Sequence, residues 1–195
     1  MKKSIIAVLL ATGLSFLTTG CSTMHMGWTA MTGQWGLDDK AMPAYDNMFT
    51  KVVEHGDPAR AMMLEWKVDE DISNEEVAES ITALTEEYNM RLTGHTKMYT
   101  KEDAKGDEVK HAEIFSLCNL TTAKVFLNYS RWYGGFMPCR IMLVEYGNGD
   151  RFLVSMDMTL AIHGGKKLPP AMLEAALKVK AAMEGVPARA AIGDF

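Results

Sequence analysis

The fold is decided by the stretch from Glu113 to Glu145, which reads EIFSLCNLTTAKVFLNYSRWYGGFMPCRIMLVE. It holds two of the three cysteines and the densest apolar run after the N-terminal leader. Its patterns predict a buried strand over 113–117, a short helix over 119–130, a Gly-Gly turn and a second strand over 139–146. Each of the two cysteines therefore lies at a junction between elements.

Cys118 comes directly before the predicted helix, which Asn119 or Thr121 can cap. Unpaired backbone N–H groups and the positive end of the helix dipole favour a thiolate at such a position. Cys139 follows Pro138, which places it at the mouth of its strand. If the helix lies back over the sheet, the two sulfur atoms meet at one edge of the fold.

The run from Leu117 to Phe152, LCNLTTAKVFLNYSRWYGGFMPCRIMLVEYGNGDRF, and the later segment IHGGKKLPP resemble the DUF302 family of small bacterial domains. The similarity extends over residues 61–195. It implies an α+β domain, often dimeric, in which an antiparallel sheet packs against two longer helices, similar to TATA-binding-protein-like folds. The resemblance implies no catalytic residues, and a cysteine pair is typical of only a subset of the family.

The first twenty residues resemble a bacterial lipoprotein signal peptide. Two lysines precede an apolar run over 5–17, and residues 17–21, LTTGC, resemble a lipobox in which Thr18 stands where leucine is commonest. In that pattern Cys21 is lipidated, by palmitate or a similar acyl chain, and becomes the new N-terminus. An ordinary cleaved signal peptide is the alternative, whereas the apolar run is short for a membrane span.

Lipidation would place the chain on a membrane, because two or three acyl chains hold a protein there where one does not. Ser22, which follows the lipidated cysteine, is typical of lipoproteins sorted to the outer membrane. We therefore expect the domain on the periplasmic face of the outer membrane, with the inner membrane as the alternative.

The remaining chain divides into a tether and amphipathic arm over 21–60 and the DUF302-like domain over 61–195. The arm has no steady hydrophobic period, and it is too rich in methionine and aromatic residues to be a solvated linker. Its Met24-His25-Met26 segment offers the soft donors that Cu(I) accepts. A copper-binding arm normally repeats such a motif, however, and this one does not.

Local patterns also predict the other elements of the domain. They are a strand from 61, a helix that Ser73 caps, a strand over 91–99, a hairpin between 141–146 and 151–156, a continuation or a bend of the last strand over 158–162, and a final helix from Pro169 that stops at Gly185 and Pro187.

Composition and motifs exclude some classes of function. The chain is 48% apolar, which suffices for a core, and its net charge of −5 without a basic patch excludes nucleic acid as a partner. It contains no GxSxG, no HExxH and no Gly-rich phosphate loop. No catalytic motif is recognisable, so whether the protein is an enzyme stays open.

The best chemical candidates are Cys118 and Cys139. With Cys21 lipidated, two thiols remain in an oxidising compartment, which suggests a structural disulfide. Alternatively, the pair cycles between dithiol and disulfide, or holds a soft metal, a haem iron or a sulfur-containing group. The spacing matches neither CxxC nor a zinc ribbon, so the sequence specifies no metal or cofactor.

Four further residues are candidates for the same site. His111 and His163 lie at the ends of predicted strands, where they can complete a metal site. Arg140 and Trp132 flank the central turn, where they can line a cleft for an anionic or flat ligand. Exposed aromatic and arginine side chains also anchor protein interfaces, and this alternative stays open.

The sequence therefore predicts a periplasmic, lipid-anchored binding or redox-carrier module that handles a thiol, a sulfur species or a soft metal through Cys118 and Cys139. The alternative is an envelope structural or assembly protein in which these cysteines form a structural disulfide. The expected partners are the membrane, through the lipid, a second copy of the chain, and a soft metal, haem or small sulfur compound.

Overall fold

A computed structural model describes residues 22–195, so the predicted signal peptide and Cys21 lie outside the described residues. The strands are β1 (Met63–Lys67), β2 (Arg91–Thr100), β3 (Val109–Cys118), β4 (Cys139–Tyr146) and β5 (Arg151–Met156). They form an antiparallel five-stranded sheet in the order β1-β5-β4-β3-β2. The helices are α2 (Ala41–His55), α3 (Pro58–Met62), α4 (Asn74–Glu87), α5 (Leu120–Tyr129), the 3₁₀ helix η1 (Arg131–Phe136), α6 (Thr159–His163) and α7 (Pro170–Ala190).

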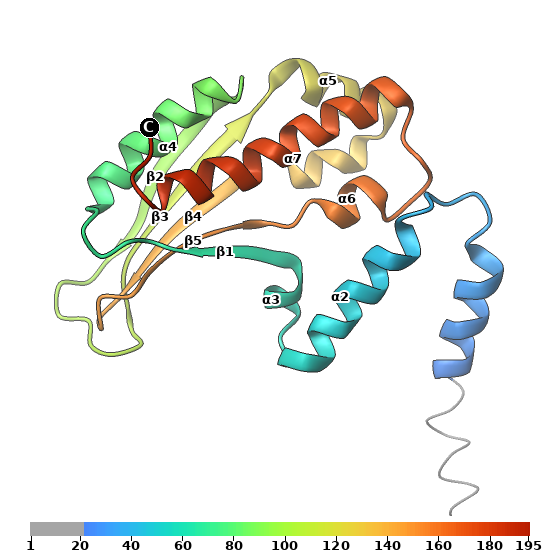
Figure 1. The fold of residues 1–195 in the computed structure, drawn as a ribbon, viewed down its shortest axis with the longest axis horizontal. Coiled ribbons are helices and arrows are strands. Elements are labelled where there is room, and N and C mark those ends of the chain that lie inside the picture. Colours follow the sequence, from blue (N-terminus) through green and yellow to red (C-terminus); the bar gives the residue numbers. More distant parts are fainter. Residues whose placement is uncertain (1–21) are drawn as a thin grey trace, which may run out of the picture.

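Two long helices, α4 and α7, lie side by side over one face of the sheet (Figure 1). The core beneath them contains fully buried side chains that alternate with less buried ones along β3, β4 and β5: Phe115, Leu117, Ile141, Leu143 and Leu153. Burying each such side chain contributes about 1.5–3 kcal/mol. The predicted α+β fold, an antiparallel sheet against two longer helices, is confirmed.

Helix α4 begins as its sequence predicts. The Ser73 hydroxyl accepts the backbone N–H of Glu76 at 3.2 Å, and the Glu76 carboxylate accepts the backbone N–H of Ser73 at 2.7 Å. This capping box gives hydrogen-bond acceptors to two backbone N–H groups at the start of the helix, which have no carbonyl partner within the helix. The face behind it carries Val77, Ile81 and Leu84, all fully buried.

After β5 the chain bends out of the sheet, which was one of the two expectations for 158–162, but residues 159–163 form the short helix α6, which was not predicted. The Asp157 carboxylate accepts the backbone N–H of Thr159 at 2.9 Å. Such a bond between an Asp side chain and the backbone two residues later turns the chain. Here it directs the chain out of the sheet directly after Met156.

Helix α7 does not stop at Gly185 and Pro187 but continues to Ala190. A Cβ atom on Gly185 would lie 2.0 Å from the Tyr88 hydroxyl, so the glycine allows this side chain to approach the helix. Pro187 has no N–H for the carbonyl of Met183, which instead accepts the buried Ser155 hydroxyl at 2.9 Å. Gly185 thus makes room for Tyr88, and Ser155 replaces the donor that Pro187 lacks, so the helix continues past both residues.

The arm is more ordered than its sequence suggests. Residues 22–33 are helical, and α2 and α3 follow before the sheet begins (Figure 1). The Tyr45 hydroxyl of α2 donates to the carbonyl of Gly164 at 2.8 Å, and the backbone N–H of Asp38 donates to the carbonyl of Gly165, also at 2.8 Å. Helix α2 is thereby tied to the end of α6. Within residues 22–195, no helix combines the length and the apolar character that crossing a membrane needs.

Replacing Ser155 by Ala is expected to destabilise the fold by about 1–3 kcal/mol, because the buried carbonyl of Met183 loses its donor. The measurement is the free energy of unfolding in urea. Pro187→Ala restores a backbone N–H for the same carbonyl, so Ser155→Ala should cost less in that background. A double-mutant cycle measures this coupling. Equal costs in the two backgrounds would contradict the role assigned to Ser155.

Candidate functional site

The two cysteines lie at the same end of the sheet but do not share a face. Cys118 is the last residue of β3 and Cys139 the first of β4, and the directly opposed pair is Leu117 with Cys139. Opposed residues point to the same face and successive residues to opposite faces, so the strand pattern directs Cys118 away from Cys139. Both thiols are free. Side chains that point apart do not form a disulfide without backbone movement. The structure therefore lacks the disulfide between Cys118 and Cys139 that the sequence analysis considered.

Neither cysteine has the acidic thiol of a redox centre. Burial raises the pKa of the Cys118 thiol, in contrast to the lowered value expected at a helix start. Burial, with a smaller contribution from Cys118, raises the pKa of Cys139 to about 11. The Asn119 side chain accepts the backbone N–H of Thr122 at 2.9 Å, so the cap takes up one of the donors that would favour a thiolate. Both thiols are therefore protonated at neutral pH, where the thiolate is the nucleophile.

Cys139 lines a pocket of about 270 Å³ at this end of the sheet. The pocket lies where β4 and β5 separate, beyond their last pair, Ile141 with Ser155. Five methionines line it together with Cys139, and we call it the sulfur pocket: Met63, Met142, Met156, Met158 and Met183. Exposed Arg140 lies at its rim, so two of the sequence candidates meet here.

The sheet register places three of these thioethers on one face. Met63 of β1 is directly opposite Met156 of β5. Met142 of β4 is opposite Val154, two residues before Met156 and on the same face. Cβ atoms of directly opposed residues are about 4.5–5.5 Å apart and diagonal ones about 7–8 Å. Because methionine has three rotatable side-chain bonds, the sulfur atoms can converge on a shared ligand.

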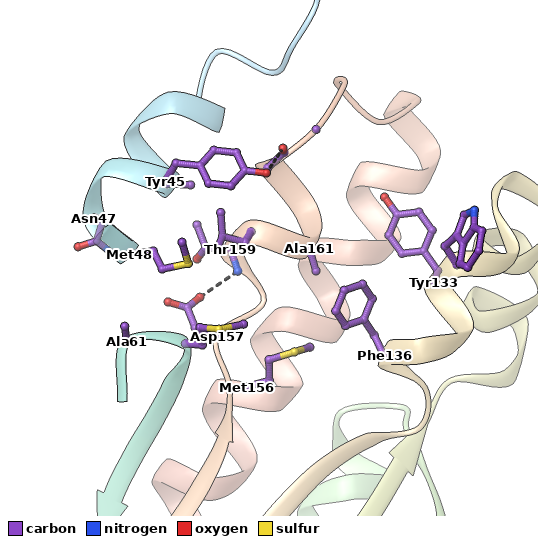
Figure 2. A pocket seen from close by; sticks show the side chains of 16 residues that line it. Tyr45, Asn47, Met48, Ala61, Tyr133, Phe136, Met156, Asp157, Thr159 and Ala161 are labelled. Atoms are coloured by element: carbon purple, nitrogen blue, oxygen red, sulfur yellow. Dashed lines mark hydrogen bonds between the residues drawn. The ribbon is translucent and has the colours of Figure 1, made fainter. Parts of the chain in front are cut away.

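A second pocket of about 370 Å³ lies beside the first and shares Phe136 and Met156 with it. Figure 2 shows Tyr45 of α2 on one side of this pocket, and Tyr133 and Phe136 of η1 on the other. Trp132 also lines it. We call it the aromatic pocket. The Trp132 side chain is 75% exposed, and the Arg131 guanidinium lies 4.9 Å from its ring centroid.

Asp157 is the one carboxylate among the described residues that line the aromatic pocket. Burial acts to raise its pKa, but hydrogen bonds from Thr159 and the positive charges of Lys180 and Lys51 outweigh burial and lower the pKa. Lys180 is 3.6 Å from Asp157 and only 2.7 Å from Glu184, so Glu184 is its closer partner. Asp157 is thus an ionised hydrogen-bond acceptor between aromatic and apolar walls.

The two candidate histidines do not join the cysteines. His111 lies on β3 seven residues from Cys118, which is about 23 Å along an extended strand. His163 is buried on α6, where its Nδ1 lies 3.2 Å from Asp38. In the part of the chain that the structure describes, no group of three or more His, Cys, Asp or Glu side chains is arranged to hold a metal. The described residues thus do not bring these histidines together with Cys118 and Cys139.

His111 instead belongs to an ionic cluster around Glu113, whose side chain is 2% exposed. His95 Nε2 lies 2.5 Å from one Glu113 oxygen and His111 Nε2 2.6 Å from the other. Burial acts to raise the pKa of Glu113, but the hydrogen bonds from both histidines and the charge of Lys97 outweigh it and lower the pKa. The other ring nitrogen of His111 lies 3.3 Å from the Thr100 hydroxyl. Both nitrogens of His111 are thus engaged within the protein.

Sequence analysis missed the methionines of the sulfur pocket and the acidic group of the aromatic pocket. The predicted hairpin already aligned Met142 with the end of β5, and this was the available signal. The pairing of β1 with β5, which adds Met63, joins strands more than eighty residues apart. Asp157 was not recognised because no helix was predicted directly after it.

Comparison with known proteins places the chain within a family. Residues 64–189 match the model described as Domain of unknown function DUF302. No match was found among curated proteins. A solved structure described as the uncharacterized conserved protein DUF302 from Bacillus stearothermophilus superposes with a TM-score of 0.51 at 16% identity, over 66% of this chain and 98% of that chain. At this identity the likeness concerns the fold alone.

Glu113→Gln is expected to reduce the loss of stability on acidification. Because the folded pKa of Glu113 lies below its unfolded value, near 4.5, the carboxylate contributes stability above that value. This contribution is lost as pH falls through the folded pKa. The measurement is the free energy of unfolding between pH 7 and pH 3 for both proteins. Their difference should shrink as the pH falls, and exposed Glu79→Gln is the matched control for the loss of one carboxylate. A Glu113→Gln difference independent of pH would contradict the assignment.

Proposed function

The chain belongs to the DUF302 family, and from that premise we propose that it is a lipid-anchored, periplasm-facing binding module that takes up a soft metal ion in the sulfur pocket. The observation that carries the proposal is a single cavity lined by six sulfur-containing residues: Met63, Met142 and Met156 from the outer face of the sheet, Cys139 and Met183 from the side of α4 and α7, and Met158 after β5. Soft thiolate and thioether ligands favour Cu(I), zinc and iron–sulfur clusters, and a set made mostly of uncharged thioethers suits Cu(I) best among these. Oxygen-rich sites suit magnesium and calcium instead.

The exposure of the methionines supports a binding role over simple packing. Methionine often fills irregular gaps in a core, where its sulfur is enclosed. Here Met63 is 36% exposed, and Met142 and Met156 are only half-buried on the sheet face opposite α4 and α7. Their side chains border a cavity and thus remain available to a ligand.

The protonation state of the donors also favours this function. Thioethers carry no proton, so they bind a cation without the cost of deprotonation. Cys139, whose pKa is raised to about 11, contributes only when metal binding displaces its proton. A dithiol-disulfide carrier needs an acidic thiol and two sulfurs within bonding reach. The described residues favour neither this redox form nor a structural disulfide between Cys118 and Cys139.

The purified protein is expected to bind one Cu(I) ion in the sulfur pocket, measured anaerobically by competition with bicinchoninate. The double variant Met142→Leu/Met156→Leu should weaken binding at least about tenfold, because leucine keeps the volume and removes the donors. The matched control is Met98→Leu, since Met98 lies on β2, is 57% exposed and does not line the pocket.

Two further variants locate the ion. Cys139→Ser should weaken binding, whereas Cys118→Ser should leave it unchanged, because Cys118 does not line the pocket. The Met24→Leu/Met26→Leu variant tests the arm. The proposal would be overturned if the Met24→Leu/Met26→Leu variant lost its copper affinity while the pocket variants kept theirs. The same holds if no variant of the pocket changes the affinity.

Lipid anchoring is tested separately. The leader pattern at 17–21 supports acylation of Cys21. Palmitate labelling in bacteria is expected to mark the protein and to disappear in Cys21→Ala, which should also leave the membrane fraction. Cys118→Ala is the control that keeps the lipobox intact. Labelling that survives Cys21→Ala would refute the anchor without affecting the metal proposal.

A further inference from the structure

We propose that the aromatic pocket is a second binding site, for a planar aromatic compound that carries a hydroxyl or N–H donor. The pocket is lined mainly by the arm, η1 and α6, whereas the sulfur pocket lies at the end of the sheet. The two share Phe136 and Met156 but no cysteine. The inference therefore does not depend on whether the sulfur pocket binds a metal.

One wall of the pocket comes from outside the family match. Ala44, Tyr45 and Met48 belong to α2, and Ala61 and Met62 to α3, all before residue 64. The Tyr45 hydroxyl holds this wall against the end of α6 through the carbonyl of Gly164. The pocket is thus built by the arm of this particular chain on top of the shared domain.

The shape and lining of the pocket suit a flat molecule. Its volume of about 370 Å³ falls within the range of small-molecule sites, roughly 300–1,000 Å³. Aromatic rings stand on both sides of it, with Tyr45 opposite Tyr133 and Phe136 (Figure 2). Small residues such as Ala161 and Gly165 line the space as well, which leaves room beside the rings. Stacked and edge-to-face contacts between rings contribute about 0.5–1.5 kcal/mol beyond buried area.

The carboxylate of Asp157 defines the second property that a ligand of this pocket needs. Asp157 Oδ1 accepts the backbone N–H of Thr159 at 2.9 Å and lies 3.6 Å from Lys180 Nζ, and the Thr159 side chain also hydrogen-bonds to this carboxylate. The two oxygens of a carboxylate offer about four acceptor positions, so Asp157 can accept a further donor. An ionised carboxylate only accepts hydrogen bonds. A ligand that reaches the Asp157 carboxylate therefore needs an O–H or N–H donor, and a ligand carboxylate would be repelled. Hydrogen bonds to charged groups are among the stronger ones in proteins.

The test compares three naphthalenes that differ in one substituent: 2-naphthol, 2-methoxynaphthalene and 2-naphthoate. Binding to the purified protein is measured by calorimetry or ligand-observed NMR. We expect 2-naphthol to bind with one molecule per chain, the methyl ether to bind about tenfold more weakly because it has no donor, and the carboxylate to bind more weakly still. Equal affinities for the naphthol and its ether would overturn the assignment of Asp157.

Variants connect this preference to the pocket. Asp157→Asn keeps an oxygen for Thr159 and removes the charge, so it should reduce the preference for naphthol over the ether. Trp132→Ala should weaken both compounds, whereas Trp35→Ala, at a residue 83% exposed and outside the pocket, should change neither. Thermal unfolding checks that each variant is folded. Unchanged binding in the folded Asp157→Asn and Trp132→Ala variants would overturn the proposal.

A last variant separates the two pockets. Met142 lines the sulfur pocket and not the aromatic one. Met142→Leu should leave 2-naphthol binding unchanged within twofold. Loss of naphthol binding in this variant would place the compound in the sulfur pocket and overturn the present assignment. Copper binding is measured in parallel, so failure of one proposal is distinguishable from failure of the other.

Discussion

The pairing register of β3, β4 and β5 is the constraint on which the rest of the structure depends. Phe115, Leu117, Ile141, Leu143 and Leu153 must all face α4 and α7, and they are fully buried there. A slip of one residue would turn every one of them to the opposite face, so burial fixes the register firmly. The same register directs Cys118 and Cys139 to different faces and sets Met142 and Met156 on a common one. The burial of the core therefore disfavours a disulfide and groups the thioethers.

Structural features that depend only on residues close together in the chain, such as helix caps and hairpins, could be predicted from the sequence. The Ser73 and Glu76 capping box, the bounds of β4 and the hairpin to β5 all depend on residues close together in the chain. The resemblance supplied the antiparallel sheet and its two helices. Features that depend on distant contacts could not be predicted in this way. Gly185 permits a helix to continue because Tyr88 occupies the space of its absent side chain, and no local pattern contains that information.

The candidate site shows the same division. Cys139, Arg140 and Trp132 were found because they flank a conspicuous turn, and all three line pockets. Which other side chains complete those pockets depends on β1 joining the sheet beside β5 and on α2 docking against α6. His111 was misplaced for a related reason. Its strand is longer than predicted, so the start of β3 and the end of β3 lie at opposite ends of the sheet.

Helix η1 connects the two pockets physically. It contributes Phe136 to both, while Met156 at the end of β5 is their other shared residue. Asp157 follows Met156 directly and turns the chain into α6, so the backbone that ends the sheet also positions the carboxylate of the aromatic pocket. A soft cation would interact with the Met156 sulfur, and a planar ligand with the same side chain from the other pocket. One thioether thus borders both spaces, although the ligands proposed for the two pockets do not depend on each other.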